Sequence, residues 1–336
     1  MKKSLIALAV LGAFAGSAMA QSSVTLFGIA DLNVRHVDND SAGSETSLSQ
    51  DGNASSRLGF RGVEDIGGGL KAGFWLEGGL SMDTGGTGGS NGQTSVFFNR
   101  RSTVSLMGGF GEIRLGRDYT PTFWNHTVFD PFGTQGVGSQ TNIQTTGTTA
   151  ITLVRANNTI GYFLPAGLGG LYGQAQYAMG EDKIGGTKNN EYWGVRLGWQ
   201  GGPANVAVAY GETDTTADTL KAWNIGASFN AGFATFMAQY HQYKAANKQT
   251  NWLVGANVPV GPGTFKVSYG VADDLFEATQ IAVGYVYDLS KRTALYAHYS
   301  QVDNDGAARF TASGSGPAIL AGDKSTGYEF GIRHSF

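Results

Sequence analysis

The apolar residues of this chain recur with a period of two, and this feature constrains its fold more than any other. Apolar residues alternate with polar or small ones along 193–199, 223–230, 265–270 and 328–336. Successive side chains of a β-strand point to opposite faces, so each segment is expected to be a strand with one apolar and one polar face. The period of an amphipathic helix hardly occurs. The chain is therefore predicted to be all-β.

Counting the alternating segments predicts roughly sixteen strands. They are expected over 24–37, 55–64, 69–80, 96–107, 110–119, 155–164, 170–179, 191–200, 204–211, 221–230, 233–242, 250–259, 263–271, 279–288, 292–302 and 326–336. The connections alternate between short turns, such as 66–69, 108–109 and 261–263, and longer polar loops, such as 39–54, 81–95, 180–190 and 303–325. Short turns at one end and long loops at the other are typical of outer-membrane barrels.

A soluble β-sandwich would also produce the alternation, but it would not explain where the aromatic residues lie. The apolar faces end repeatedly in Trp, Tyr and Phe, as the girdles at a membrane interface require. The opposite faces carry Arg, Lys, Glu, Gln and Gly, which suits a water-filled lumen. An even number of strands lets the last strand pair with the first, so that no edge meets lipid. We therefore expect a sixteen-stranded antiparallel transmembrane β-barrel.

The first twenty residues have the features of a secretory leader. Lys2 and Lys3 precede the uncharged apolar stretch 5–15, and Ala18-Met19-Ala20 supplies the small residues of a cleavage site. A retained anchor is the alternative, but a membrane-spanning helix needs roughly 20 apolar residues. The sequence predicts a signal peptide over 1–20, cleaved after Ala20, and a single barrel domain over 21–336.

The segment 120–154 has no sustained alternation, although it is rich in aromatic residues. Long connections inside compact folds are usually functional or packed against themselves. The interior of a sixteen-stranded barrel is too wide for wall side chains to fill. This third long loop is therefore predicted to fold inward and narrow the lumen to a constriction. A mobile external loop is the alternative.

Several other classes of function find little support. The 23 basic residues are outnumbered by 26 acidic ones even before Lys2 and Lys3 are removed with the leader, which argues against a nucleic-acid partner. There is no cysteine, the five histidines lack zinc-site spacing, and no cofactor motif occurs. Residues 38–49 begin like a calcium loop but end in Ser49 instead of Glu. A barrel-borne hydrolase could use His298 beside Ser300, but no orienting acid is evident. The chain is therefore not expected to be an enzyme.

The residues also resemble a known family, that of the general porins of Gram-negative bacteria, in its beta-proteobacterial and neisserial branch. The matching motifs are 24–28 (VTLFG), 56–62 (SRLGFRG), 64–72 (EDIGGGLKA), 108–111 (GGFG), 115–121 (LGRDYTP), 155–160 (RANNTI) and 331–336 (GIRHSF). The resemblance implies an outer-membrane homotrimer in contact with lipid, through which small hydrophilic solutes and ions diffuse passively. It also implies insertion by the barrel-assembly machinery, which would recognise the last strand and its terminal Phe336.

The same resemblance places arginines opposite the third loop at the constriction. The matching positions are Arg57, Arg100 and Arg155, and Asp130 is the acidic candidate on the loop itself. Arg101 is adjacent to Arg100, and only one of the two can face inward in a regular strand.

Strand parity adds further inward candidates, and together these residues predict a selectivity. The additional pore-lining candidates are Arg61, Arg114, Asp118, Arg196 and Arg333. Fixed arginines in a narrow pore favour anions, whereas acidic residues on external loops are screened by salt. The pore is therefore expected to be anion-selective despite its negative net charge.

Overall fold

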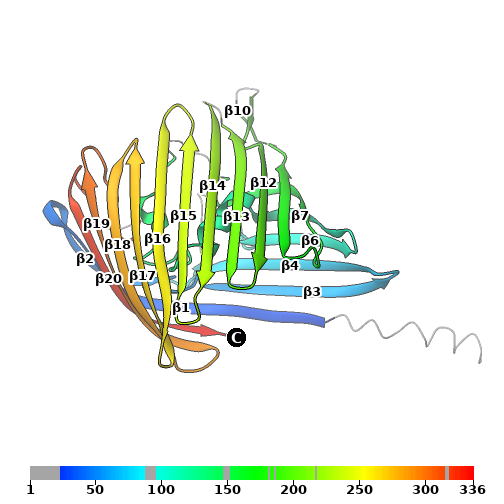
Figure 1. Cartoon of the computed structure of the whole chain (residues 1–336), viewed down its shortest axis with the longest axis horizontal. Helices are drawn as coiled ribbons and strands as arrows, with labels where there is room; N and C mark the ends of the chain where they lie inside the picture. The colour runs from blue at the N-terminus through cyan, green and yellow to red at the C-terminus, as the bar shows by residue number, and fades with distance from the viewer. Residues whose placement is uncertain are drawn as a thin grey trace, which may run out of the picture.

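In the computed structural model, the described residues are 23–87, 96–146, 152–180, 182–184, 187–215, 218–314 and 318–336. They contain the expected sixteen barrel strands, arranged as one antiparallel sheet that curves round on itself (Figure 1). The barrel strands are β1 (Ser23–Asn39), β3 (Arg57–Gly67), β4 (Leu70–Ser81), β6 (Arg101–Gly108), β7 (Gly111–Tyr119), β8 (Arg155–Phe163), β9 (Leu171–Ala178), β12 (Tyr192–Gly201), β13 (Ala204–Asp214), β14 (Thr219–Asn230), β15 (Thr235–Lys244), β16 (Lys248–Val260), β17 (Gly263–Asp274), β18 (Glu277–Asp288), β19 (Thr293–Asp305) and β20 (Lys324–Ser335).

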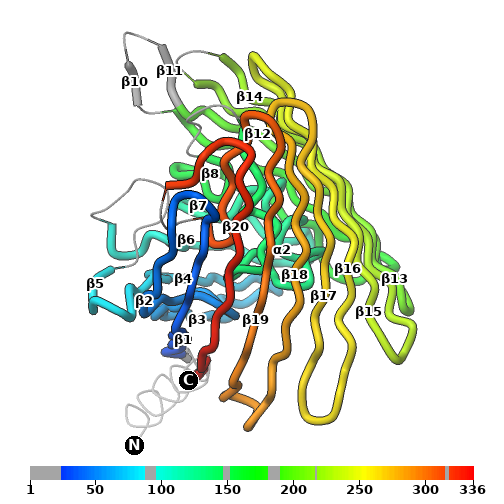
Figure 2. Tube along the Cα trace, turned by 90° about the vertical axis from the view of Figure 1, so that its left-hand side faces the viewer, coloured from blue at the N-terminus to red at the C-terminus, as the bar shows by residue number. Residues whose placement is uncertain are grey.

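The first and last strands close the barrel, as the even strand number predicts. β1 pairs with β20 from Ile29 to Asn39, and its first residues pair with β3 from Ser23 to Ile29. Phe336 completes this seam: its N–H donates to the Gly28 carbonyl at 3.0 Å, and its carbonyl accepts from the Gly28 N–H at 3.1 Å. Figure 2 shows β1 and β20 side by side. No strand edge of the barrel is left open at this junction.

Four further strands and one short 3-10 helix lie in the loops, beyond the predicted pattern. β2 (Gly43–Gln50) pairs with the end of β1, and η1 (Asp40–Ala42) connects them. β5 (Gly86–Thr87) pairs with β4, and β10 (Asp182–Ile184) forms a separate hairpin with β11 (Thr187–Asn189). β6 begins at Arg101, five residues later than the alternation suggested, because 97–98 form a turn. Among the described residues, no helix has the length and hydropathy of a membrane span.

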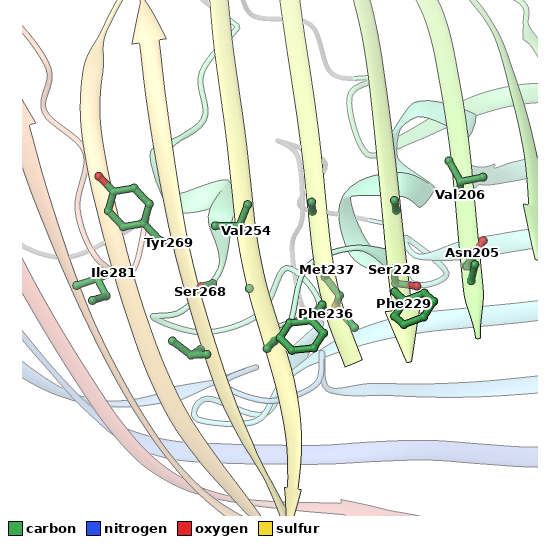
Figure 3. A pocket seen from close by; sticks show the side chains of 16 residues that line it. Asn205, Val206, Ser228, Phe229, Phe236, Met237, Val254, Ser268, Tyr269 and Ile281 are labelled. Carbon is green, nitrogen blue, oxygen red and sulfur yellow. The ribbon is translucent and has the colours of Figure 1, made fainter. Parts of the chain in front are cut away.

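The two faces of the wall differ as the alternation requires. On β14, Trp223, Ile225 and Phe229 point outward and are exposed, whereas Asn224 points inward and is buried. Figure 3 shows the same outward apolar surface on neighbouring strands, where Val206, Phe236, Val254, Tyr269 and Ile281 belong to a shallow, almost wholly apolar depression. Nearly all of this outer face is hydrocarbon, as contact with lipid demands.

The third loop lies inside the barrel, which confirms its predicted inward fold. It forms α2 (Pro121–Val128) and the 3-10 turn η2 (Gln140–Ile143), and α2 contacts β12, β13 and β14. Figure 2 places α2 within the curve of the wall. Phe129, Phe132 and Ile143 of this loop are among the largest fully buried side chains described. Part of the apolar packing of the molecule therefore lies between the third loop and the inner wall.

Two wall glycines allow this close packing. A Cβ added at Gly226 would lie 2.0 Å from Phe129 Cδ2, and one at Gly284 would lie 3.2 Å from Phe132 Cε1. Real Cβ atoms do not approach as closely as the first of these contacts, so Phe129 can occupy its site only because position 226 has no side chain. Glycine inside a strand often marks such an approach of another part of the chain.

Candidate functional site: an arginine cluster beside the third loop

Three arginines from different parts of the sequence line one cavity beside the third loop. Arg57 begins β3, Arg100 lies on the bend before β6, and Arg155 begins β8. All three line a cavity of about 500 Å³ together with Tyr119. The Tyr119 hydroxyl accepts hydrogen bonds from Arg100 Nη2 at 2.7 Å and from Arg155 Nη2 at 2.6 Å. We call these three arginines and Tyr119 the arginine cluster.

Two carboxylates face the cluster and neutralise it only in part. Glu77 Oε1 lies 2.6 Å from Arg100 Nε and 3.4 Å from Arg57 Nη1. Asp51 lines the same cavity, and its burial raises the pKa of its carboxyl. Among the described residues, Arg155 has no carboxylate within 4.0 Å, and its guanidinium lies 4.2 Å from the centre of the Tyr119 ring. The site therefore retains an excess of positive charge.

The expectation that only one of Arg100 and Arg101 faces inward is wrong. Arg101 is the first residue of β6 and shares the inward face with Thr103 and Ser105. Arg100 precedes the regular strand, and the bend turns its side chain inward as well, toward Glu77 and Tyr119. Strand parity does not apply across a bend, so both guanidinium groups face the lumen.

Asp130 does not lie with the arginines. It is 3% exposed and sits inside the third loop, where its carboxylate accepts hydrogen bonds from the backbone N–H groups of Phe132, Thr134 and Gln140 at 2.8 to 3.2 Å. Burial raises the pKa of this carboxyl to about 6. Asp130 thus organises the turn of the loop, and it is not among the residues lining the arginine cavity.

Buried polar side chains attach the third loop to the barrel wall. Asn125 Nδ2 donates to the Asn224 side chain at 2.8 Å, and Asn224 Nδ2 donates to the Thr122 carbonyl at 2.9 Å. Across the lumen, Glu329 on β20 accepts from the Val137 N–H at 3.2 Å. Because buried polar groups are costly when unpaired, these bonds specify where the loop lies.

The remaining charged candidates all point into the lumen, but their partners differ. Arg114 pairs with Glu112 at 2.8 Å and with Asp118 at 2.6 Å, so its charge is largely balanced. The Arg61 guanidinium instead lies 5.0 Å from the Trp75 ring and has no carboxylate within 4.0 Å among the described residues.

On the other side of the lumen, Arg196 Nε donates to Asn125 Oδ1 at 2.6 Å, so this arginine also helps to hold α2. Arg333 Nη2 lies 4.0 Å from Asp288 near the end of β20. None of these positions belongs to the arginine cavity itself.

A family model described as a Gram-negative porin matches residues 7–307. The chain belongs to this family. Outer membrane porin protein 32 of Delftia acidovorans is 42% identical over 359 residues, with 100% of both chains covered. The major outer membrane protein P.IB of Neisseria meningitidis is 29% identical over 367 residues, with the same coverage.

Solved porin structures agree with this assignment. An anion-selective porin from Comamonas acidovorans has a TM-score of 0.84 and 38% identity, covering 94% of this chain and 100% of that one. OmpT of Vibrio cholerae, in a trimer form, has a TM-score of 0.69 and 14% identity, covering 94% of this chain and 99% of that one. The chain is a general porin of the outer membrane, a channel and not an enzyme.

The hydrolase alternative also fails on the geometry of this porin. The expectation that His298 lacks an orienting acid is wrong, because its Nδ1 lies 3.0 Å from Glu329 Oε1. Among the described residues, however, His298 Nε2 has no hydrogen-bond partner, and the Ser300 hydroxyl accepts a hydrogen bond from Gln280 instead of donating to His298. Both residues are buried, at 3% and 0% exposure, on the part of the wall that the third loop contacts. A substrate could not reach the hydroxyl without displacing the loop.

Strand parity gives Glu77 an inward side chain, but the sequence has no signal for its pairing with Arg57 and Arg100 or for the parts played by Tyr119 and Asp51. Tyr119 is the last residue of β7 and follows a bulge between Gly116 and Asp118, which the period-two pattern does not reveal. Asp51 comes from an external loop. The predicted leader lies outside the described residues.

Proposed function

We propose that this porin is anion-selective and that the arginine cluster is its constriction. The observation that carries the proposal is an imbalance of charge across the cavity. Arg57, Arg100 and Arg155 face the third loop, whose only acidic residue within 120–154 is Asp130. That carboxylate is buried and bound to backbone N–H groups, so the loop offers the cavity no acidic side chain.

Position explains why these few charges outweigh the net charge of the chain. Charges on external loops are screened beyond roughly 8–10 Å at physiological salt. A guanidinium on a confined wall has less water between itself and a passing ion, so it acts more strongly. A solved porin that is 38% identical to this chain is itself described as anion-selective, which supports the proposal.

The direct test is the zero-current potential of the purified porin in planar bilayers separating two KCl concentrations. Its sign should be that of a chloride-selective membrane. A potential of the sign expected for potassium would contradict the proposal. The same preparation should give stepwise conductance increments.

We further propose that the porin assembles as a homotrimer and is inserted by the barrel-assembly machinery through its last strand. A related structure is described in a trimer form, although at 14% identity. The exposed apolar outer wall requires a lipid or protein neighbour on every side. Trimers that resist detergent until they are heated would support the homotrimer. A porin that is monomeric under all mild extraction conditions would contradict it.

A further inference from the structure

A second hollow adjoins the arginine cavity on the side of α2. It has a volume of about 310 Å³ and shares Phe123, Thr141 and Val154 with the lining of the arginine cavity. Leu153 and Tyr243 form part of its walls. The two hollows therefore lie side by side: three guanidinium groups line one, and among the described residues His126 is the only basic side chain that lines the other.

Parallel aromatic rings connect the two hollows. The Tyr119 and Phe123 rings lie 5.5 Å apart with 5° between their planes, and the Phe123 and His126 rings lie 6.0 Å apart with 13° between theirs. Burial lowers the pKa of His126 to about 3, so its imidazole carries no charge near neutral pH. The stack thus leads from a positive cavity to an uncharged aromatic one.

The arginine cluster has hydrogen-bond donors to spare at this junction. Arg155 is 5% exposed, and among the described residues its Nε has no acceptor. Its only close oxygen partner described is the Tyr119 hydroxyl, which already accepts from Arg100. A carboxylate is the planar acceptor that guanidinium groups match best.

We infer that the two hollows together form a binding site for aromatic monocarboxylates. The carboxylate would lie against Arg155 and its neighbours, and the flat ring would lie against Phe123 in the second hollow. An aliphatic monocarboxylate would use the arginines alone. A dicarboxylate whose second carboxylate entered the second hollow would meet no basic side chain other than His126 among the described lining residues, at a desolvation cost. This inference rests on the proposed anion selectivity.

The experiment compares three anions as inhibitors of chloride current in planar bilayers. Benzoate, cyclohexanecarboxylate and acetate are added as potassium salts, and the concentration that halves the current is measured for each. Benzoate should act at the lowest concentration, because it alone combines a carboxylate with a flat aromatic face. An aromatic pair contributes enough for roughly a 2- to 10-fold difference from cyclohexanecarboxylate. Equal values for all three anions would overturn the inference.

The variant Phe123→Leu keeps an apolar side chain but removes the ring. It should abolish the difference between benzoate and cyclohexanecarboxylate. The matched control is Phe163→Leu, because Phe163 lies 3.9 Å beneath the Arg114 guanidinium and lines neither hollow. The control should preserve the difference. If both variants lose it, or if Phe123→Leu retains it, the site is not at Phe123.

The zero-current potential in KCl distinguishes a failure of the aromatic carboxylate site from a failure of the proposed anion selectivity. A wild-type channel that prefers chloride but does not distinguish the three carboxylates would overturn only the aromatic site. A channel that prefers potassium would overturn the proposed anion selectivity. Trimer migration before and after heating identifies any variant that fails to assemble.

Discussion

At the scale of single residues, each guanidinium of the arginine cluster has different partners. Arg100 is paired closely with Glu77, Arg57 more loosely with the same carboxylate, and Arg155 with no carboxylate among the described residues. An ion in the lumen therefore encounters Arg155 as the least compensated charge. Glu77 limits how positive the site becomes, because it is the acceptor for two of the three arginines.

This arrangement predicts that Glu77→Gln makes the pore more anion-selective. The amide keeps the size of the side chain and one acceptor oxygen, but it removes the negative charge facing Arg57 and Arg100. The zero-current potential in KCl should shift further toward chloride. The control is Glu112→Gln, which removes a partner of Arg114 outside the arginine cavity. This control should shift the zero-current potential less than Glu77→Gln does. A shift toward potassium in Glu77→Gln would contradict this reasoning.

His126 gives the third loop a dependence on pH. Its ring lies 3.7 Å from that of His241, its Nε2 lies 3.0 Å from the Tyr243 hydroxyl, and no acidic partner is described for it. Burial lowers its pKa from 6.5 to about 3. Because the pKa of His126 is lower in the folded state, its contribution to folded-state stability is fully present above pH 6.5 and is lost as the pH falls toward 3. Docking of α2 should therefore weaken on acidification.

The measurement is the frequency of current fluctuations in single channels between about pH 7 and about pH 3.5. Fluctuations should increase at the acidic end in the wild type and less in His126→Gln. Asp130 acts in the opposite direction, because its raised pKa of about 6 gives stability that is present below 3.8 and lost as the pH rises through 6. An equal pH response in wild type and His126→Gln would exclude His126 as the cause.

At the scale of elements, the alternation predicted every barrel strand because each strand separates an apolar medium from a wet lumen. The alternation did not predict the elements that lie outside the wall between the apolar medium and the lumen. The strands β2, β5, β10 and β11 lie within the connections between barrel strands, where neither face needs to be apolar. The helix α2 has eight residues, and its buried face is mostly polar: Thr122, Asn125 and His126 are buried together with Pro121. It forms where hydrogen bonds from Asn125 to Asn224 and from Arg196 to Asn125 hold it against the wall. Such long-range contacts leave no local signal.

The closing seam gives a prediction for the last strand. Phe336 makes two backbone hydrogen bonds with Gly28, and its ring covers Gly28 so closely that an added Cβ would lie 2.3 Å from Cζ. Deleting Phe336 removes both bonds and leaves the start of β1 without its cover. We expect less trimer in the outer membrane, measured by heat-modifiable migration. The control is Phe336→Tyr, which keeps the ring. Unchanged trimer yield after the deletion would contradict a role for this residue in assembly.

At the scale of the whole molecule, the resemblance to the porin family pointed to the three arginines, although Arg57 and Arg155 are nearly a hundred residues apart in the sequence. The sequence could not predict that Asp130 turns away from them. That depends on three backbone N–H groups brought together by the turn of the loop. Nor could parity predict Arg100 and Arg101 on the same side, since a bend separates them.

The leader remains a proposal at this scale. Ala18 and Ala20 occupy the small-residue positions before the cleavage site, so the outer-membrane form should begin at Gln21. Mass spectrometry of the extracted protein tests this. An outer-membrane form that retains Lys2 would show that the leader is not removed, and the barrel would then carry an additional apolar segment.

We propose that a few arginines at the third loop set the selectivity of a channel whose net charge is negative. The most direct test is the zero-current potential of wild type, Arg57→Ser and Arg155→Ser in the same KCl gradient, with Arg292→Ser, outside the arginine cavity, as control. The wild type should prefer chloride. The zero-current potential of both cluster variants should shift toward potassium, and that of Arg155→Ser should shift more. The potential of the control should equal that of the wild type. A potassium-selective wild type, or cluster variants that match it, would contradict the account.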